Sequence, residues 1–414
     1  MKKNTLLLFF LFHILNTSLT VGQNSPKTVY DINIDNAKDL GDIPLSNFFK
    51  SLKIIPLERV RRNSFLFVSK LYTCRDKIFV LSKFMGDNLF VFDQDGKYIR
   101  TISRKGNWPG EYAKLDDIVV DSLSNSVWLL DNPLDDSKSE LHEYNYITGK
   151  YIKTIPLNEE TEPLHLFKIG NELYGDIYYN YYKTGKSLSG KGCYLLRKIE
   201  MDTGNTTEYY LLASEYNKGR ANKVLTDNHA FFPTSSEHCL FVQSCMDTIM
   251  SISSKGVQPY LAIKSNNFIN TQTIQDYLDE NRPEDPFYSY MLTKNLIYRI
   301  ANLMENNGKI FFSYLQGYTT TNIYYDTQEN QAYKYTGLND LLFKEGQESS
   351  YLITSYLTTD SKGVYYVINV DGFSMIKRYV EEGRLNPNFE NIEELKNISE
   401  ESSNPILLYY EFKD

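Results

Sequence analysis

Short apolar runs alternate with polar turns along most of the chain, and two stretches show this pattern most clearly. Residues 77–102 and 126–155 each contain an apolar segment, a polar loop, a second apolar segment and a tight turn that leads into a third. Alternation over segments this short predicts β-strands. The turns contain Gly96 and Gly149, and glycine supplies the positive φ that a tight hairpin requires. We therefore expect an all-β chain built from hairpins.

The same kind of turn recurs at a nearly constant distance along the chain. Its marks are Gly96, Gly149, Gly204, Gly256, Asn330 and Gly383, which are 53, 55, 52, 74 and 53 residues apart. The longest interval contains the polar segment 267–296, which we interpret as a helical or loop insert. A period of about 50 residues is typical of repeats of four short strands. Six marks therefore predict a six-bladed β-propeller of four-stranded antiparallel blades.

Two lone strands, at 48–57 and 405–412, flank the repeats. We predict that these N- and C-terminal strands pair within one blade and close the ring, because closure removes two exposed strand edges. A pair of β-sandwiches would also consist of short strands, but the regular period favours the propeller. A β-helix is disfavoured because its repeats are much shorter.

The N-terminus has the pattern of a secretory signal. Two lysines precede an apolar run at 6–15, and small or polar residues follow as far as Gly22. An uncleaved N-terminal anchor is the alternative, but the run is short for a bilayer span. No cysteine follows the run, so lipid attachment is not expected. We expect export to the periplasm or cell surface, without a membrane span after signal removal. The predicted organisation is a signal peptide at 1–22, an N-terminal extension at 23–45 and the propeller at 46–414.

Composition narrows the classes of partner. The net charge is −8, and the densest basic cluster is only 59–62. Nucleic acid is therefore not an expected partner, since phosphate binding needs a basic surface. The 34 tyrosines and 23 phenylalanines suit half-buried strands. The cysteines are too few for a disulfide framework, and we expect buried free thiols at Cys74, Cys193, Cys239 and Cys245.

Residues 104–131 carry a family resemblance. The segment contains Gly106, Pro109-Gly110-Glu111-Tyr112 and then an apolar strand. This resembles the six-bladed propellers that gut anaerobic bacteria export, which are related in fold to NHL and TolB-like propellers. In the exported propellers, a Gly-x-Gly-Pro-Gly-Glu-Tyr segment typically joins the first two blades. Trp108 replaces the middle glycine of that pattern. The ending at 404–407 is similar to that family's terminal strand. The resemblance implies the propeller fold and export, and it implies little about function.

The loop at 104–112 is the candidate ligand-binding segment. It joins an outer strand to the next inner strand, which in propeller geometry places it near the channel mouth. The long connections 213–233 and 267–296 are expected on the same face. Stacking and hydrogen bonds from an exposed loop would suit a carbohydrate or a peptide. Alternatively, Pro109 and Gly110 shape the crossover and the aromatic residues fill the seam between blades. The predicted ligand-binding residues are Arg104, Trp108, Glu111 and Tyr112.

Several segments approach a chemical motif without completing it. Residues 185–187 end like a phosphate-binding loop but lack its upstream glycine, and 93–96 begin like a calcium loop but lack the later ligands. An acidic loop could hold a cation, although a solvated strand connection explains it as well; it contains Asp131, Asp135, Asp136 and Glu140. The histidines lack the i, i+4 spacing of metal ligands, and they are His142, His165, His229 and His238. We predict no catalytic residue, metal ligand or cofactor.

These observations leave three hypotheses. The first is an exported, non-catalytic binding or scaffold propeller that recognises a carbohydrate, a peptide or an envelope protein on its loop-rich face. The second is a metal-dependent hydrolase or lyase, similar to lactonase-like propellers, with Asp116, Asp117 and Glu172 in the central channel. The third is a purely structural partner in an envelope complex.

Overall fold

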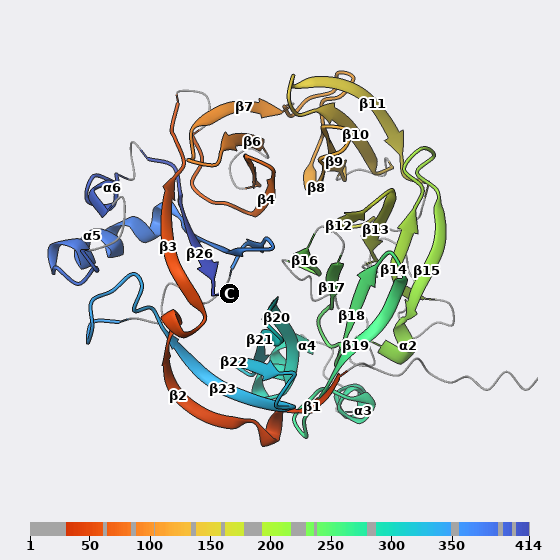
Figure 1. Ribbon diagram of the computed structural model, residues 1–414. Helices are drawn as coiled ribbons and strands as arrows, with labels where there is room; N and C mark the ends of the chain where they lie inside the picture. Colours follow the sequence, from red (N-terminus) through yellow and green to blue (C-terminus); the bar gives the residue numbers. More distant parts are fainter. Residues whose placement is uncertain are drawn as a thin grey trace, which may run out of the picture.

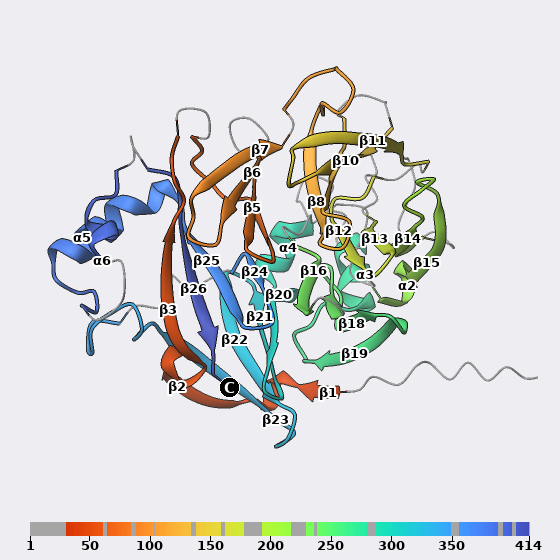
Figure 2. The same cartoon turned by 45° about the horizontal axis from the view of Figure 1, so that its top comes forward.

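Six β-sheets stand around a central axis in the computed structural model (Figure 1; Figure 2). The structure describes residues 30–413, apart from 61–63, 84–87, 103, 134–137, 159–161, 178–192, 217–228, 236–237, 280–286, 349–355, 388–391 and 400–402. The predicted signal peptide lies outside the described residues. The chain is a six-bladed β-propeller of mostly antiparallel, four-stranded blades, as the repeat spacing predicts.

Blades 1 to 3 follow one another along the chain, each from its inner to its outer strand. Blade 1 consists of β4 (Lys70–Cys74), β5 (Lys77–Ser82), β6 (Asn88–Asp93) and β7 (Tyr98–Ile102). Blade 2 consists of β8 (Leu115–Asp121), β9 (Ser126–Asp131), β10 (Glu140–Asn145) and β11 (Lys150–Pro156). Blade 3 consists of β12 (Leu166–Ile169), β13 (Glu172–Asp176), β14 (Tyr194–Ile199) and β15 (Thr206–Leu212), and α2 (Ala213–Tyr216) follows it.

Helices connect blade 4 to blade 5, and each of these two blades has a fifth strand. Blade 4 contains β16 (Phe231–Ser235), β17 (His238–Phe241), β18 (Thr248–Ser253) and β19 (Gly256–Lys264). Helices α3 (Thr271–Asp279) and α4 (Phe287–Thr293) follow, within the segment that we interpreted as an insert. Blade 5 contains β20 (Ile297–Asn306), β21 (Lys309–Gln316), β22 (Thr319–Asp326) and β23 (Gln331–Leu338).

Blade 6 closes the ring with strands from both ends of the chain. Its order is β24 (Thr358–Thr359), β25 (Gly363–Ile368), β26 (Ile406–Phe412) and β3 (Phe49–Pro56). Strand β3 pairs with β26 in antiparallel register, with Ile54 opposite Leu408. The predicted pairing of terminal strands is confirmed. Because β26 lies between β25 and β3, the N-terminal strand supplies the outer edge of the last blade.

The segment before β3 adds two strands that the sequence analysis did not anticipate. Strand β1 (Tyr30–Asn33) pairs in parallel with β19, and β2 (Lys38–Pro44) pairs in parallel with β23. Figure 1 shows β1, β2 and β3 following the outside of blades 4, 5 and 6 in turn. Ile32 and Ile43 are buried in these contacts. The chain therefore covers the outer edges of three blades with its own N-terminal segment.

The hairpin glycines have a second role besides backbone conformation. Gly96 has a φ of 82°, and an added Cβ there would lie 2.2 Å from the carbonyl oxygen of Pro56. Gly204 has a φ of 70°, and its Cβ would lie 2.0 Å from the carbonyl oxygen of Pro156. Each glycine lies in the outer hairpin of one blade, and each proline ends the outer strand of the preceding blade. Glycine is therefore required at these marks for the close approach of neighbouring blades.

The sixth mark does not lie in a hairpin, so that part of the repeat prediction is wrong. Gly383 follows α5 (Phe373–Glu381) and has a φ of 65°, the left-handed conformation that commonly ends a helix. Helices α5 and α6 (Ile392–Lys396) connect β25 to β26 and lie on the outside of blade 6 (Figure 1). The fourth strand of this blade comes from β3, so no hairpin is needed at that point.

Apolar residues fill the seams between blades. Phe79 and Leu129 belong to a cluster between blades 1 and 2, and Val80 and Leu407 to a cluster between blades 1 and 6. The four cysteines are free; Cys193, Cys239 and Cys245 are buried, whereas Cys74 is half-buried. No helix among the described residues is long and apolar enough to cross a membrane.

Candidate functional site

Polar contacts between residues of the loop at 104–112 hold this loop together. The Nε atom of Arg104 lies 2.5 Å from Oε1 of Glu111, and Oε2 of Glu111 accepts a hydrogen bond from the backbone N–H of Trp108 at 3.0 Å. These contacts, with the Trp108 bond as the larger cause, lower the pKa of Glu111. At Gly106 a Cβ would lie 2.0 Å from Oε2 of Glu111, so glycine makes room for this carboxylate. The loop is therefore held in one shape.

The position of this loop differs from the sequence prediction. Gly110 packs against Tyr144 of β10 and Tyr151 of β11, and the Tyr144 hydroxyl donates to the Gly110 carbonyl. Strands β10 and β11 are the outer strands of blade 2, so the loop lies at the rim of the ring, where β7 meets β11, and not at the channel mouth (Figure 1). Because it packs against Tyr144 and Tyr151, the loop at 104–112 lies at the outer side of blade 2 before the chain continues into the inner strand β8.

Two of the four predicted site residues are exposed on this loop, whereas Glu111 is mostly covered and Tyr112 is buried. Trp108 is 74% exposed, and the Arg104 side chain is largely exposed beside Glu111. Tyr112 is fully buried in the seam between blades 1 and 2. The expected exposure of Tyr112 is wrong, because its ring fills the seam, as the alternative interpretation expected. Gly110, with a φ of 83°, shapes the crossover as that interpretation also expected.

Further exposed apolar residues lie on the outer elements of blades 1 and 2. We name the set with Trp108 the rim surface: Ile99 on β7, Ile147 in the β10–β11 turn, and Tyr151 and Ile152 on β11. The side chain of Arg100 approaches Gly149, which shows that β7 and this turn are in contact. An exposed apolar set on adjoining elements is typical of an interaction surface.

The channel carboxylates of the second hypothesis already have cationic partners. Asp117 is fully buried, lies 2.6 Å from Nζ of Lys70, and accepts hydrogen bonds from the Tyr72 hydroxyl and the Leu166 N–H. Asp116 lies 2.7 Å from Nζ of Lys114 in its own blade and 3.5 Å from Nζ of Lys83, which follows β5 of blade 1. Both carboxylates therefore fasten neighbouring blades together.

Glu172 does not join Asp116 and Asp117. It begins β13, where it lies 2.5 Å from Nζ of Lys198 and accepts a hydrogen bond from Tyr174. Asp176 ends the same strand and holds Nδ1 of His165 at 2.5 Å. The three candidate carboxylates therefore do not converge on one site.

Sequence reasoning missed several polar groups near the inner strands. A cavity of only about 30 Å³ is lined by Lys70, Tyr72 and His229 together with aromatic residues of blades 4 and 6. Burial, with the charge of Lys70 as the next cause, lowers the pKa of His229 to about 3, so this imidazole is neutral at ordinary pH. Lys70 and Tyr72 on β4 are far in the chain from His229, which precedes β16, so no local spacing could have indicated them.

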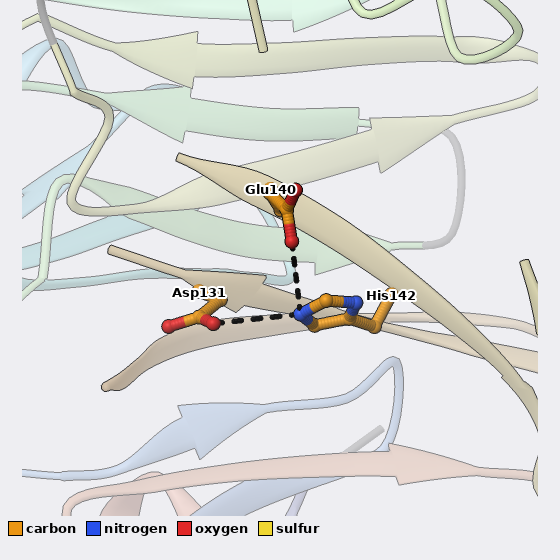
Figure 3. A group of neighbouring side chains, drawn as sticks. All are labelled: Asp131, Glu140 and His142. Carbon is orange, nitrogen blue, oxygen red and sulfur yellow. Dashed lines mark hydrogen bonds and ion pairs between the residues drawn. The ribbon is translucent and has the colours of Figure 1, made fainter. Parts of the chain in front are cut away.

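Asp131, Glu140 and His142 form a group that could hold a metal ion (Figure 3). Their ligand atoms lie within 4.8 Å of one another. Asp131 accepts hydrogen bonds from the N–H groups of Ala113 and Lys114, and Nδ1 of His142 lies 2.7 Å from the Thr154 hydroxyl. These contacts give the group a structural role in fastening the rim loop to blade 2.

The other candidate metal-binding and phosphate-binding segments lie either outside the described residues or in a hairpin turn. Asp135, Asp136 and the loop at 185–187 lie outside the described residues. Asp93 accepts hydrogen bonds from the N–H groups of Asp95 and Lys97, which gives the 93–96 segment the role of a hairpin turn.

Comparisons with known proteins support the fold. The profile of a family described as "Domain of unknown function (DUF4934)" matches residues 29–411. A Bacteroides fragilis protein named as a candidate exported protein aligns with a TM-score of 0.70 at 15% identity, covering 93% of this chain and 100% of its own. A member of the DUF4221 family from Bacteroides vulgatus aligns with a TM-score of 0.47 at 12% identity, covering 88% and 97%. No curated protein matches.

Proposed function

This chain belongs to the family described as a domain of unknown function (DUF4934), and we propose that it is an exported, non-catalytic binding propeller. Its partner is a protein that docks on the rim surface of blades 1 and 2. Export is supported by the signal pattern at 1–22, and it places the protein in the periplasm or on the cell surface. A relation to NHL and TolB-like propellers is part of the same proposal.

The observation that carries the proposal is the exposure of Trp108 on a braced loop. A 74% exposed Trp keeps a large apolar ring in water, although most Trp residues are highly buried. Trp is the residue type most enriched where interfaces concentrate their binding free energy. The Arg104–Glu111 contact holds the loop in shape, so little conformational entropy is lost when a partner binds.

The surroundings of Trp108 favour a protein partner. Ile99, Ile147 and Ile152 extend the apolar surface along strands and a turn. Aliphatic side chains contribute to binding chiefly by burial against another apolar surface, which a protein supplies. A non-catalytic role is supported by the carboxylates near the inner strands, since Asp116 and Asp117 are each held by a lysine.

Site-specific photo-crosslinking tests the proposal. A photoreactive amino acid at position 108, expressed in the source cells, should give a discrete adduct with one envelope protein. The matched control is position 318, where Tyr318 is 83% exposed in the turn between β21 and β22 of blade 5. With that partner purified, Trp108→Ala should weaken binding by at least about 2 kcal/mol, or about 30-fold. Tyr318→Ala should leave the affinity unchanged. Identical adducts at both positions, or unchanged affinity of Trp108→Ala, would contradict the proposal.

A further inference from the structure

A cavity of about 440 Å³ lies between blades 5 and 6, on the opposite part of the ring from the rim surface. Blade 5 contributes residues of all four strands, and blade 6 contributes residues of β25 and β3. Strand β2 adds Asp39 at the outer side. The volume of the cavity lies within the range of small-molecule pockets, about 300–1,000 Å³.

An irregularity in the innermost strand of blade 5 opens this space. The pairing of β20 with β21 shifts register between Ala301 and Met304, and Asn302 within that bulge has a φ of 55°. A bulge bends its strand and re-aims its side chains. Asn302 donates a hydrogen bond from Nδ2 to the Ser313 hydroxyl at 2.8 Å, which holds the bulge in place. The small residues Thr321 and Gly337 on the facing strands leave the space unfilled.

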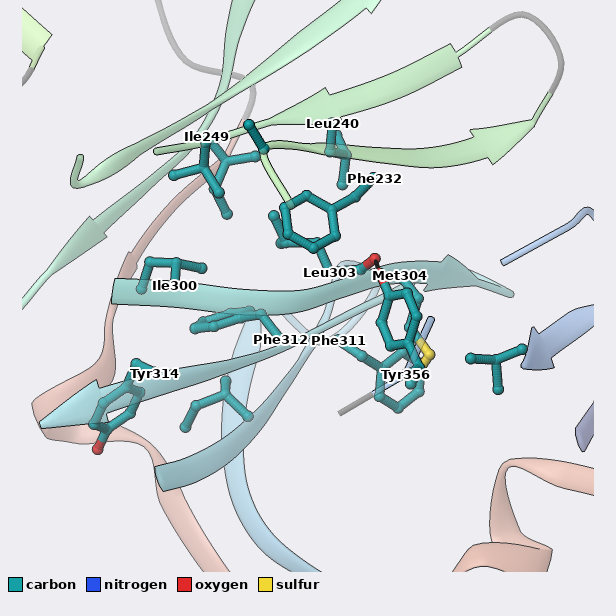
Figure 4. Close-up of a cluster of buried hydrophobic side chains, with 14 of the residues drawn as sticks. Phe232, Leu240, Ile249, Ile300, Leu303, Met304, Phe311, Phe312, Tyr314 and Tyr356 are labelled. Carbon is teal, nitrogen blue, oxygen red and sulfur yellow. Dashed lines mark hydrogen bonds between the residues drawn. The ribbon is translucent and has the colours of Figure 1, made fainter. Parts of the chain in front are cut away.

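Polar groups with no protein partner line the cavity and are open to it. Tyr314 and Tyr366 are each 5% exposed, and neither hydroxyl has a hydrogen-bond partner among the described residues. Figure 4 shows the Tyr314 hydroxyl on the side of its ring that faces away from the hydrophobic cluster. The half-buried Asn322 lines the same wall, and its amide also lacks a hydrogen bond within the described parts of the chain. These groups are therefore available to hydrogen-bond water or a ligand in the cavity.

The lining is otherwise aromatic and nearly uncharged. Phe48, Phe49 and Tyr335 add rings to those of Tyr314 and Tyr366. The charged members of the lining are Asp39 and Lys334, whose charges offset each other. Burial raises the pKa of Tyr366 well above its ordinary value, so its hydroxyl stays neutral and can donate. An apolar ligand would leave the hydroxyls and the amide unpaired, which is costly.

We propose that the cavity between blades 5 and 6 binds a neutral saccharide. The apolar faces of a sugar ring fit against the aromatic side chains, and its hydroxyl groups can both donate to and accept from tyrosine hydroxyls and the Asn322 amide. The assignment is independent of the rim surface, because the two sites share no residue.

The test uses the mature protein and a panel of neutral mono- and disaccharides, followed by saturation-transfer NMR and calorimetry. At least one panel sugar should bind. Tyr366→Phe and Tyr314→Phe each remove one oxygen and should weaken that binding about 3- to 10-fold. Thr320→Trp, at an exposed position of β22 on the edge of the cavity, should abolish it. The matched control Tyr318→Phe, outside the cavity, and Trp108→Ala, at the rim, should bind as the wild type does.

Three results would overturn the assignment. One is the absence of binding by every neutral sugar of the panel to the folded wild-type protein. Another is sugar binding that Thr320→Trp and Tyr366→Phe leave unchanged, because the sugar would then bind elsewhere. The third is preference for sugar phosphates or uronic acids over their neutral counterparts. Thermal unfolding of each variant establishes that a loss of binding does not come from loss of the fold.

Discussion

The buried ion pair between Lys70 and Asp117 allows a quantitative test of how the first three blades are joined. Lys70 begins β4 of blade 1, Asp117 lies in β8 of blade 2, and Leu166, whose N–H donates to Asp117, begins β12 of blade 3. Lys70 is 7% exposed and Asp117 is fully buried. The Asp117→Asn variant keeps the size of the side chain but removes its charge, so a buried ammonium group loses its counter-ion.

The expected cost follows from the burial of both groups. Removing one partner of a buried pair typically costs 3–5 kcal/mol, because the remaining charge stays desolvated. With an unfolding entropy of about 2.1 cal/mol/K per residue, a chain of this length should lose about 4–6 °C in Tm. The surface pair of Lys53 with Asp95, at 2.8 Å, is the control, since both side chains are exposed. Asp95→Asn should therefore change the stability only slightly.

Urea unfolding followed by circular dichroism measures these differences. The double variant Lys70→Met with Asp117→Asn should recover at least half of the loss, because no unpaired charge remains buried. A cost for Asp117→Asn as small as that for Asp95→Asn would refute the reasoning. A double variant less stable than Asp117→Asn alone would also refute it, since Lys70 would then stabilise the fold without a counter-ion.

The same pair gives a pH dependence with a defined sign. Burial by itself raises the pKa of Asp117, but the charge of Lys70 and the hydrogen bonds outweigh burial and hold this pKa below 3.8. A lowered carboxyl pKa stabilises the fold at pH values above 3.8, and this contribution is lost as the pH falls through the folded-state pKa. The stability difference between wild type and Asp117→Asn should therefore be constant above about pH 5 and shrink progressively below about pH 3.8.

Three further predictions concern closure, the N-terminal strands and the rim loop. Deleting 403–413 removes β26 from the middle of blade 6 and should abolish cooperative thermal unfolding; an unchanged Tm would show that the ring does not depend on this strand. Deleting 30–45 removes only added outer strands, so calorimetry should show a lower Tm with a cooperative transition retained. Tyr112→Ala should destabilise the protein by about 3–5 kcal/mol in urea unfolding, whereas Trp108→Ala should change its stability by less than about 0.5 kcal/mol. Equal effects of these two substitutions would contradict their assigned burial.

The six-bladed ring could be predicted from the sequence because its repeats are marked by local hairpin turns. Five of the six turn marks lie in hairpins between the third and fourth strands of a blade, counted from the centre, and positive φ at Gly96 or Gly204 follows from local backbone geometry. The pairing of 48–57 with 405–412 was predictable for another reason: both ends of the chain carried an unpaired apolar strand. Gly383 was misassigned because a glycine that ends a helix and a glycine in a hairpin share the same left-handed conformation.

The sites were less predictable because they depend on contacts between distant segments. Nothing local to 104–112 indicates that Tyr144 and Tyr151 hold the loop at the rim, or that Tyr112 turns into the seam. The pairing of Lys70 with Asp117 joins different blades, and so does the lining of the 440 Å³ cavity. A single sequence indicates which residues are aromatic or charged, but their convergence is a property of the closed ring.

The N-terminal strands divide the ring into two unlike halves, and each proposed site belongs to one of them. Strands β1, β2 and β3 cover the outer edges of blades 4, 5 and 6, whereas within the described residues β7, β11 and β15 remain the outermost strands of blades 1, 2 and 3. The rim surface lies on β7 and β11, where a partner can approach the ring from outside. The cavity lies in the covered half, where β2 supplies Asp39 to its wall, and Phe48 and the first residue of β3, Phe49, lie beside it. Deletion of 30–45 should therefore weaken saccharide binding while leaving the crosslink at position 108 intact, because only the cavity is built in part from the wrapped segment.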